Sequence, residues 1–397
     1  MLFHELTFVP EGDEVVVGRK DTGDYVVLPA DGAGLLSQLV DGATPDEAAE
    51  WFEATFGEPV DITEFLDVLD ELGFVRSADA PVPVESPEPV RLRRLSRVLF
   101  SRFAFACYLA LVVVWFLVMT GHHDLLPRPS QMFFTSSLVI VQITVIFGQL
   151  PLIFLHEGCH VLAGRRLGLP SRLGVSNRWI YIVFETVMNS VMSVPRRQRY
   201  LPFLAGMLGD VLVVCLLDVT AQLAKNPDGS LSLVSRIALT FAFTVFVRLA
   251  WQFQLYLRTD LYYVFATALN CHDLHEASGV LLRNWIWRRL GRTDRVVDEG
   301  QWADRDRRVG RWYGPVMVLG LVVSLAVALL GSLPVVVQYA VLIVERLTSG
   351  RIDASFVDAL VSLLMNVTVL VLPVVLSRRK RRRAAVGTLR TVPEKVG

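Results

Sequence analysis

The chain has 397 residues, of which 53% are hydrophobic, and its mean hydropathy is +0.46. These values are too high for an ordinary soluble protein and favour one that lies in a membrane. The net charge of zero hides an acidic beginning and a basic remainder, because residues 1–90 hold 21 of the 39 acidic residues but only 3 of the 39 basic ones. This split is typical of two parts in two environments, and it requires no nucleic-acid partner.

The first part of the chain is predicted to be a small α+β domain over residues 1–77. Short apolar stretches alternate with turn residues between positions 6 and 28, which predicts three short strands. Helical patterns follow over residues 33–40, 44–56 and 61–72. No signal peptide precedes them, so we expect this domain to stay in the cytoplasm.

A linker is predicted at residues 78–90, since this stretch contains four prolines and no helical period. Residues 91–385 are then predicted to form a membrane domain, followed by a C-terminal tail at 386–397. The four cysteines are scattered singly, so no disulfide framework is expected.

Apolar runs in the membrane domain are long enough to cross a bilayer as helices. We predict about six spans, at about 98–120, 133–157, 201–223, 233–256, 313–344 and 355–376. The fifth run is long, and a break is expected at Gly331 or Pro334. Six spans place the basic clusters on one side, which predicts that both termini are cytoplasmic.

The segment PLIFLHEGCHVLAGRR carries the strongest chemical signal. His156 and His160 are four residues apart, so on a helix both imidazoles project from one face and can share a metal ion. Glu157 is suited to act as a general base toward a metal-bound water. Three ionisable groups at the end of an apolar span are costly, which favours a functional site over chance. Two histidines and a carboxylate with an open position suit zinc, although this ligand set alone does not exclude iron or cobalt as the metal.

A third ligand is expected from another ionisable residue at the same membrane depth. The spans offer few, namely Asp210, Asp218, Arg248, Asp260 and Glu345. Asp260 is the first choice, because it follows the fourth span at the level of His156. Asp210 is an alternative ligand, or a partner that hydrogen-bonds a ligating histidine. An ion pair between Asp260 and Arg258 is the simplest non-metal alternative.

Two further segments have compositions that suggest a role near the site. Residues 271–275, Cys-His-Asp-Leu-His, resemble a metal-binding tract, but a polar turn before a helix at 276–287 explains them as well. Residues 173–191 are moderately apolar and partly β-prone, so we expect either a re-entrant or interfacial element that presents substrate backbone, or a peripheral loop.

The motif and the later aspartate resemble the site-two protease family of intramembrane zinc metalloproteases. That family commonly has Asn-Pro-x-x-x-x-Asp-Gly, where this chain has Gln254 to Leu261, so only Asp260 matches. Tyrosines 262 and 263 after the aspartate resemble the bacterial putative peptide zinc metalloprotease branch. The resemblance implies Zn²⁺ as cofactor, a peptide or protein substrate, and a bacterial cytoplasmic membrane.

The first domain resembles the PqqD-like fold, a winged-helix module that binds leader peptides of ribosomally made natural products. The turns at Leu28-Pro29 and at 41–44, and the ending LDELGFV, carry this likeness. The resemblance implies that a peptide adds a strand beside a groove between the third strand and the third helix. The groove residues would be Tyr25, Val26, Val27, Leu28, Phe65 and Leu69.

These expectations combine into a membrane metalloprotease that hydrolyses a peptide captured by its first domain. A non-catalytic scaffold, or an export or immunity component, is the alternative. Glu157 distinguishes them, since a purely structural zinc site needs no general base beside its ligands.

Overall fold

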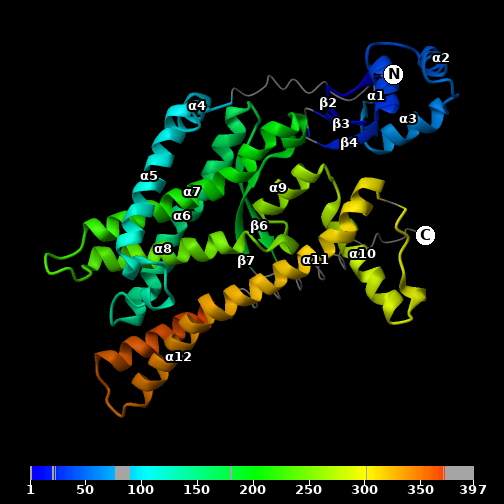
Figure 1. Ribbon diagram of the computed structural model, residues 1–397. Helices are drawn as coiled ribbons and strands as arrows, with labels where there is room; N and C mark the ends of the chain where they lie inside the picture. Colours follow the sequence, from blue (N-terminus) through cyan, green and yellow to red (C-terminus); the bar gives the residue numbers. More distant parts are fainter. Residues whose placement is uncertain are drawn as a thin grey trace, which may run out of the picture.

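The computed structural model describes residues 2–19, 22, 24–76, 90–178, 181–300, 302–369 and 371. The end of the first domain at residue 77, almost all of the predicted linker, and the C-terminal tail lie outside this part. The protein is mostly helical, at 71%, with a small sheet region near the N-terminus. Figure 1 shows this region at one end of a long helical body.

The N-terminal domain contains an antiparallel sheet in the order β2-β3-β4. Its strands are β2 (Leu6–Glu11), β3 (Glu14–Arg19) and β4 (Tyr25–Pro29), which agree with the three predicted strands. Two short strands, β1 (Leu2–Phe3) and β5 (Val75–Arg76), form a second pair that the sequence patterns did not indicate.

Three helices follow the sheet: α1 (Ala30–Val40), α2 (Pro45–Phe56) and α3 (Ile62–Glu71). Helix α1 packs on β3 and β4, whereas α2 packs on α1 and α3. Thr44 forms a capping box with Glu47, and Asp61 caps α3 by accepting from two backbone amides, so both starts lie where the cap residues predict them. Gly73 ends the region with a positive φ of 73°. Apolar side chains from the sheet, α1 and α3 form the core, including Val17, Leu36, Leu69 and Phe74.

The helical body begins with a short helix and continues with long apolar ones. Its helices are α4 (Arg93–Leu99), α5 (Arg102–Gly121), α6 (Leu138–Arg166), α7 (Arg196–Leu223), α8 (Leu233–Trp251), α9 (Asp260–Leu269), α10 (Leu274–Arg289), α11 (Asp304–Val327) and α12 (Leu333–Thr348). Among the described residues, five stretches are long and apolar enough to cross a membrane, and the sixth predicted span corresponds to a shorter apolar helix, Ala354–Val369.

The predicted break in the fifth span takes the form of a π-helical turn. Residues Ala328–Ser332 join α11 to α12 without ending the helix, so the stretch runs from Asp304 to Thr348. Gly331 lies inside this turn, and Pro334 lies two residues beyond its end. An apolar setting disfavours a true gap, because freed backbone groups would find no water there, whereas a π-turn keeps most of them paired.

Helix α7 lies at the centre of the body and contacts α5, α6, α8 and α9. Half of the residues in the apolar part of α7 are buried inside the protein. The corresponding share is 6% for α5 and 6% for the stretch from α11 to α12. The outer helices expose large apolar side chains such as Phe103 and Leu330, which are 78% and 75% exposed. A water-soluble surface rarely carries so much contiguous apolar area.

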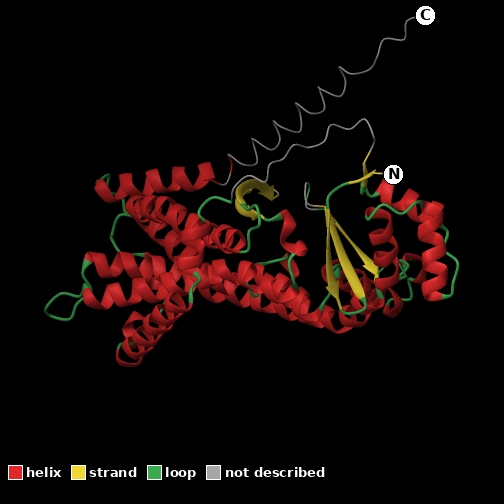
Figure 2. Ribbon diagram, turned by 90° about the horizontal axis from the view of Figure 1, so that it is seen from above, coloured by secondary structure: helices red, strands yellow, loops and turns green. Residues whose placement is uncertain are grey.

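A β-hairpin separates α6 from α7. It consists of β6 (Arg172–Arg178) paired with β7 (Tyr181–Val187), and a 3₁₀ turn, η3 (Asn189–Ser193), leads from it into α7. The small curled hairpin is visible in the middle of the molecule in Figure 2, and β7 contacts α6. Part of the expected β character of residues 173–191 is therefore present.

Candidate metal centre

Two helices, α6 and α9, bring the predicted metal ligands together. His156 and His160 lie on consecutive turns of α6, and Asp260 is the first residue of α9. The backbone amide of Asp260 donates to the Gln252 side chain at 3.1 Å, and Thr259 donates to the Gln252 carbonyl at 2.7 Å, which fixes the start of α9. Both histidines are buried, and they are 6% and 4% exposed.

The three potential ligand atoms form a nearly equilateral triangle. The Nε2 atoms of His156 and His160 are 3.3 Å apart, and Oδ2 of Asp260 lies 3.3 Å from the first and 3.2 Å from the second. Ligand atoms around a tetrahedral zinc ion, with bonds of about 2.0–2.1 Å, stand about 3.3–3.4 Å apart. The triangle therefore has the size of one face of such a site.

The outer nitrogen of each imidazole has its own acceptor. Nδ1 of His156 donates to Oδ2 of Asp210 at 3.0 Å, and Nδ1 of His160 donates to the carbonyl oxygen of Pro202 at 2.7 Å. These bonds place the ring proton of each neutral histidine on Nδ1 and leave the Nε2 lone pair directed at the centre. Asp210 thus takes the position of a hydrogen-bonding partner rather than that of a third ligand.

This arrangement calls for a cation. Two imidazole lone pairs and a carboxylate oxygen converge, and Oδ2 of Asp260 is buried without a hydrogen-bond partner. Three electron-rich atoms at this spacing repel one another unless a proton or a metal ion lies between them. A single proton can bridge only two of the three atoms, whereas a metal ion serves all three equally, so the residues fit a metal.

Gly206 on α7 provides the space beside the two histidines. A Cβ at this position would lie 2.2 Å from Nε2 of His160 and 2.7 Å from Nε2 of His156. Only glycine keeps this side of the triangle open. Gly206 was not among the predicted site residues, because no ionisable or metal-binding group marks it in the sequence.

Glu157 follows His156 on α6 and is partly buried. The hydroxyl of Thr186, on β7, donates to its carboxylate Oε2 at 2.8 Å and lies 3.0 Å from its backbone oxygen. The carboxylate is therefore held by the β-hairpin. Thr186 was not among the predicted site residues, and nothing in its local sequence marks it.

Arg248 on α8 extends the hydrogen-bond chain away from the centre. Its guanidinium binds both oxygens of Asp210, with Nε donating at 2.9 Å to Oδ2, and one of its NH groups also lies 3.3 Å from the Leu152 carbonyl. A bidentate pair of this kind fixes the orientation of the carboxylate and hence of His156. Arg248 was noted as a charged residue in a span, but its partner was not predicted.

Asp260 does not form the alternative ion pair with Arg258, and the histidines of the 271–275 tract have partners away from the metal centre. Arg258 pairs with Glu276 at 2.7 Å instead of with Asp260. In the 271–275 tract, His272 lies 3.9 Å from Glu11 and His275 packs edge-on against Tyr262. Within the described residues, His156, His160 and Asp260 form the one group suited to hold a metal ion.

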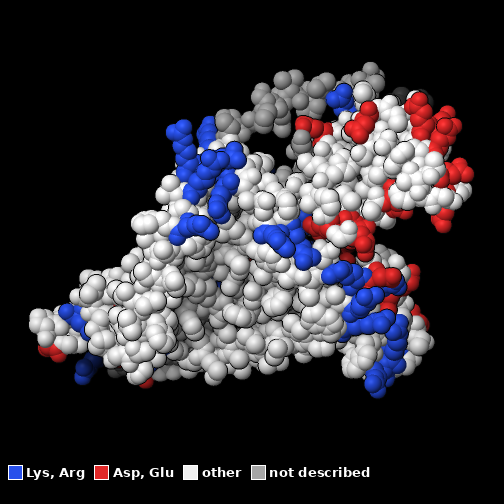
Figure 3. All heavy atoms as spheres, turned by 45° about the horizontal axis from the view of Figure 1, so that its top comes forward, with Lys and Arg blue, Asp and Glu red and all other residues white. Residues whose placement is uncertain are grey.

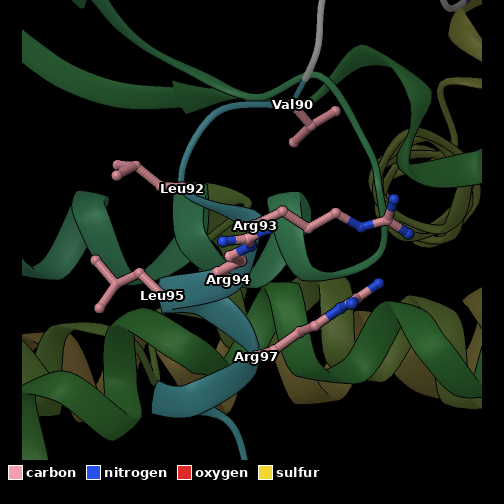
Figure 4. A pocket seen from close by; sticks show the side chains of 6 residues that line it. All are labelled: Val90, Leu92, Arg93, Arg94, Leu95 and Arg97. Carbon is pink, nitrogen blue, oxygen red and sulfur yellow. The ribbon is translucent and has the colours of Figure 1, made fainter.

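A second feature, a basic pocket, lies at the start of the helical body and shares no residue with the metal centre. Figure 4 shows side chains of the α4 region around it, with three arginines among its lining residues Val90, Leu92, Arg93, Arg94, Leu95 and Arg97. Figure 3 shows basic side chains on the helical body and acidic ones over the N-terminal domain, as the charge split predicts.

The predicted peptide-groove residues occupy β4 and α3. Strand β4 pairs with β3 along one edge and lies at the end of the sheet order, so its residues Tyr25–Leu28 are on an edge strand. Val26, Leu28 and Phe65 pack against the domain core, and Leu69 is 1% exposed within it. Leu69 therefore belongs to the domain core and offers no surface to a peptide.

No family model, no curated protein and no solved structure matches this chain.

Proposed function

We propose that this chain is a membrane-embedded zinc metalloprotease. The observation that carries the proposal is the triangle of His156 Nε2, His160 Nε2 and Asp260 Oδ2, with edges of 3.2–3.3 Å. Glu157 directly follows His156 in the chain. Two histidines and one carboxylate leave one tetrahedral position open, which is the pattern of catalytic rather than structural zinc sites.

His156, His160 and Asp260 would hold the metal. When bound there, zinc would lower the pKa of a water at the open position toward about 7 and would polarise the substrate carbonyl. Glu157 accepts a proton from the attacking water while the oxygen of that water bonds to the carbonyl carbon. As the carbon–nitrogen bond breaks, Glu157 returns that proton to the leaving amine, so the products are one carboxylic acid and one amine.

Other residues orient the groups of the site, and the N-terminal domain would bind the substrate. Asp210 and Arg248 orient His156, and Thr186 orients Glu157. We further propose that the membrane is a bacterial cytoplasmic membrane, with the site near its cytoplasmic face. The N-terminal domain would capture a peptide along the free edge of β4, and its acidic surface favours a basic segment.

The deciding experiment compares the purified parent with Glu157→Gln and Asp260→Ala. Bound metal is measured by elemental analysis, and cleavage is measured with a mixture of fluorescence-quenched peptides. We expect Glu157→Gln to keep zinc and to lose about 10²–10⁴-fold in cleavage rate. We expect Asp260→Ala to lose zinc. A parent without metal would favour the scaffold or export alternative.

A further inference from the structure

A buried ion pair joins the N-terminal domain to the helical body. Oε1 of Glu11, at the end of β2, lies 2.5 Å from a guanidinium nitrogen of Arg199, in the first turn of α7. The two side chains are only 3% and 2% exposed. Charges this deeply buried are stable only when they are paired, so this contact belongs to a packed interface.

Further contacts surround the pair. Gly18 on β3 approaches η3 so closely that a Cβ there would lie 3.0 Å from Oγ of Ser193. The ring of Tyr25 on β4 lies 6.3 Å from that of His272. Figures 1 and 2 show the β2–β4 sheet on the side of the domain that faces the body, with α1–α3 on the outside.

Arg199 also holds the chain that leads from the hairpin into α7. One guanidinium NH donates to the carbonyl of Met192 at 2.8 Å, and Nε donates to the carbonyl of Val194 at 2.9 Å. A single buried guanidinium thus binds Glu11 from one domain and the end of η3 from the other.

The segment from Thr186 to Val194 connects the residue that binds Glu157 with the carbonyls that Arg199 binds. Thr186, on β7, donates to the Glu157 carboxylate, and only a few residues separate it from the carbonyls that Arg199 binds. We propose that the docked N-terminal domain holds Glu157 in position through Arg199 and the 186–194 segment, so that hydrolysis requires the docked domain. This inference rests on the proposed protease function, and Glu11 and Arg199 act in it as positioning residues.

The physical reason is the cost of an unpaired buried charge. Without the Glu11 carboxylate, Arg199 keeps only two backbone acceptors for its charge, which favours its movement toward water. That movement would release the carbonyls of Met192 and Val194 and loosen the hairpin. A small displacement of a catalytic group can lower a rate by as much as about 10²-fold.

Docking is tested with the double variant Gly18→Cys and Ser193→Cys in the full-length protein. The close approach of these positions suits a disulfide, whose Cβ atoms stand about 3.5–4.5 Å apart. We expect mild oxidation to give a peptide linked between residues 18 and 193, identified by mass spectrometry, which neither single variant forms. Absence of this link in the double variant would overturn the proposal.

Coupling is tested with Glu11→Gln, with Glu58→Gln, an exposed acid of the same domain, as the matched control. We expect Glu11→Gln to keep its zinc, to exchange the amides of residues 186–194 at least tenfold faster, and to cleave the quenched peptides about tenfold to hundredfold more slowly. Glu11→Asp, which keeps the charge, should recover part of both effects.

The outcomes separate the two proposals. Faster exchange with unchanged cleavage, or unchanged exchange, would overturn the coupling. If the parent binds no zinc and cleaves nothing, the protease function fails, and the linked peptide together with faster exchange in Glu11→Gln would still support the mechanical connection between the domain and the hairpin.

Discussion

Gly206 and His160 are in such close contact that a methyl group on the glycine would lie 2.2 Å from Nε2 of the imidazole. Real Cβ atoms do not approach another heavy atom below 3.0 Å, so either α6 and α7 must separate or the imidazole must rotate away. Either movement disrupts the triangle of ligand atoms.

We therefore expect Gly206→Ala to lower zinc affinity by more than about tenfold, as measured by competition with a chelator. Gly158→Ala is the matched control, because Gly158 lies between the two histidines on α6 and a Cβ there meets nothing within 4 Å. Equal zinc affinity in the two variants would contradict the assigned role of Gly206.

In the proposed zinc site, Asp210 orients His156 and does not itself bind the metal. Replacing it with Asn removes the charge that holds His156 and Arg248, so we expect Asp210→Asn to weaken zinc binding by about 10–100-fold. Asp218→Asn is the control, since Asp218 is a buried carboxylate on the same helix that accepts from Trp115 at 2.8 Å. If Asp218→Asn weakened zinc binding as strongly, the effect would come from helix packing.

Thr186 should affect the rate of hydrolysis and not the metal. Thr186→Val keeps the shape of the side chain but removes the donor to Glu157, so we expect normal zinc content and about a tenfold lower turnover. Thr186→Ser restores the hydroxyl and should recover most of the activity. A loss of zinc in Thr186→Val would show that the residue maintains the fold of the site instead.

His275 makes the stability of the α9–α10 region depend on pH. Burial, and secondarily the positive charge of Arg258, lower the pKa of His275 below its ordinary value. Protonation therefore favours the unfolded state, so the contribution of His275 is fully present above about pH 6.5 and is lost as the pH falls below it. Thermal unfolding from about pH 8 to about pH 5 should show a smaller decline for His275→Phe than for the parent. Parallel curves would count against this assignment.

Much of the local structure could be predicted from short stretches of sequence. Thr44 and Asp61 start their helices because a cap acts within three residues, and turn residues delimit the three strands for a similar reason. The four-residue spacing of His156 and His160 predicts a shared helix face by helical geometry alone. Asp260 could be selected because ionisable residues are rare near apolar spans.

The tertiary structure decided what those residues meet. Gly206, Thr186 and Arg248 act on the site from three different elements, and Glu11 reaches Arg199 from another domain. No pattern within one segment encodes such contacts, because they depend on which helices approach and at what distance. The sequence by itself therefore determined the ligand types and their helical spacing, whereas only packing decided the orientation of the ligands, the support of Glu157 and the docking of the N-terminal domain.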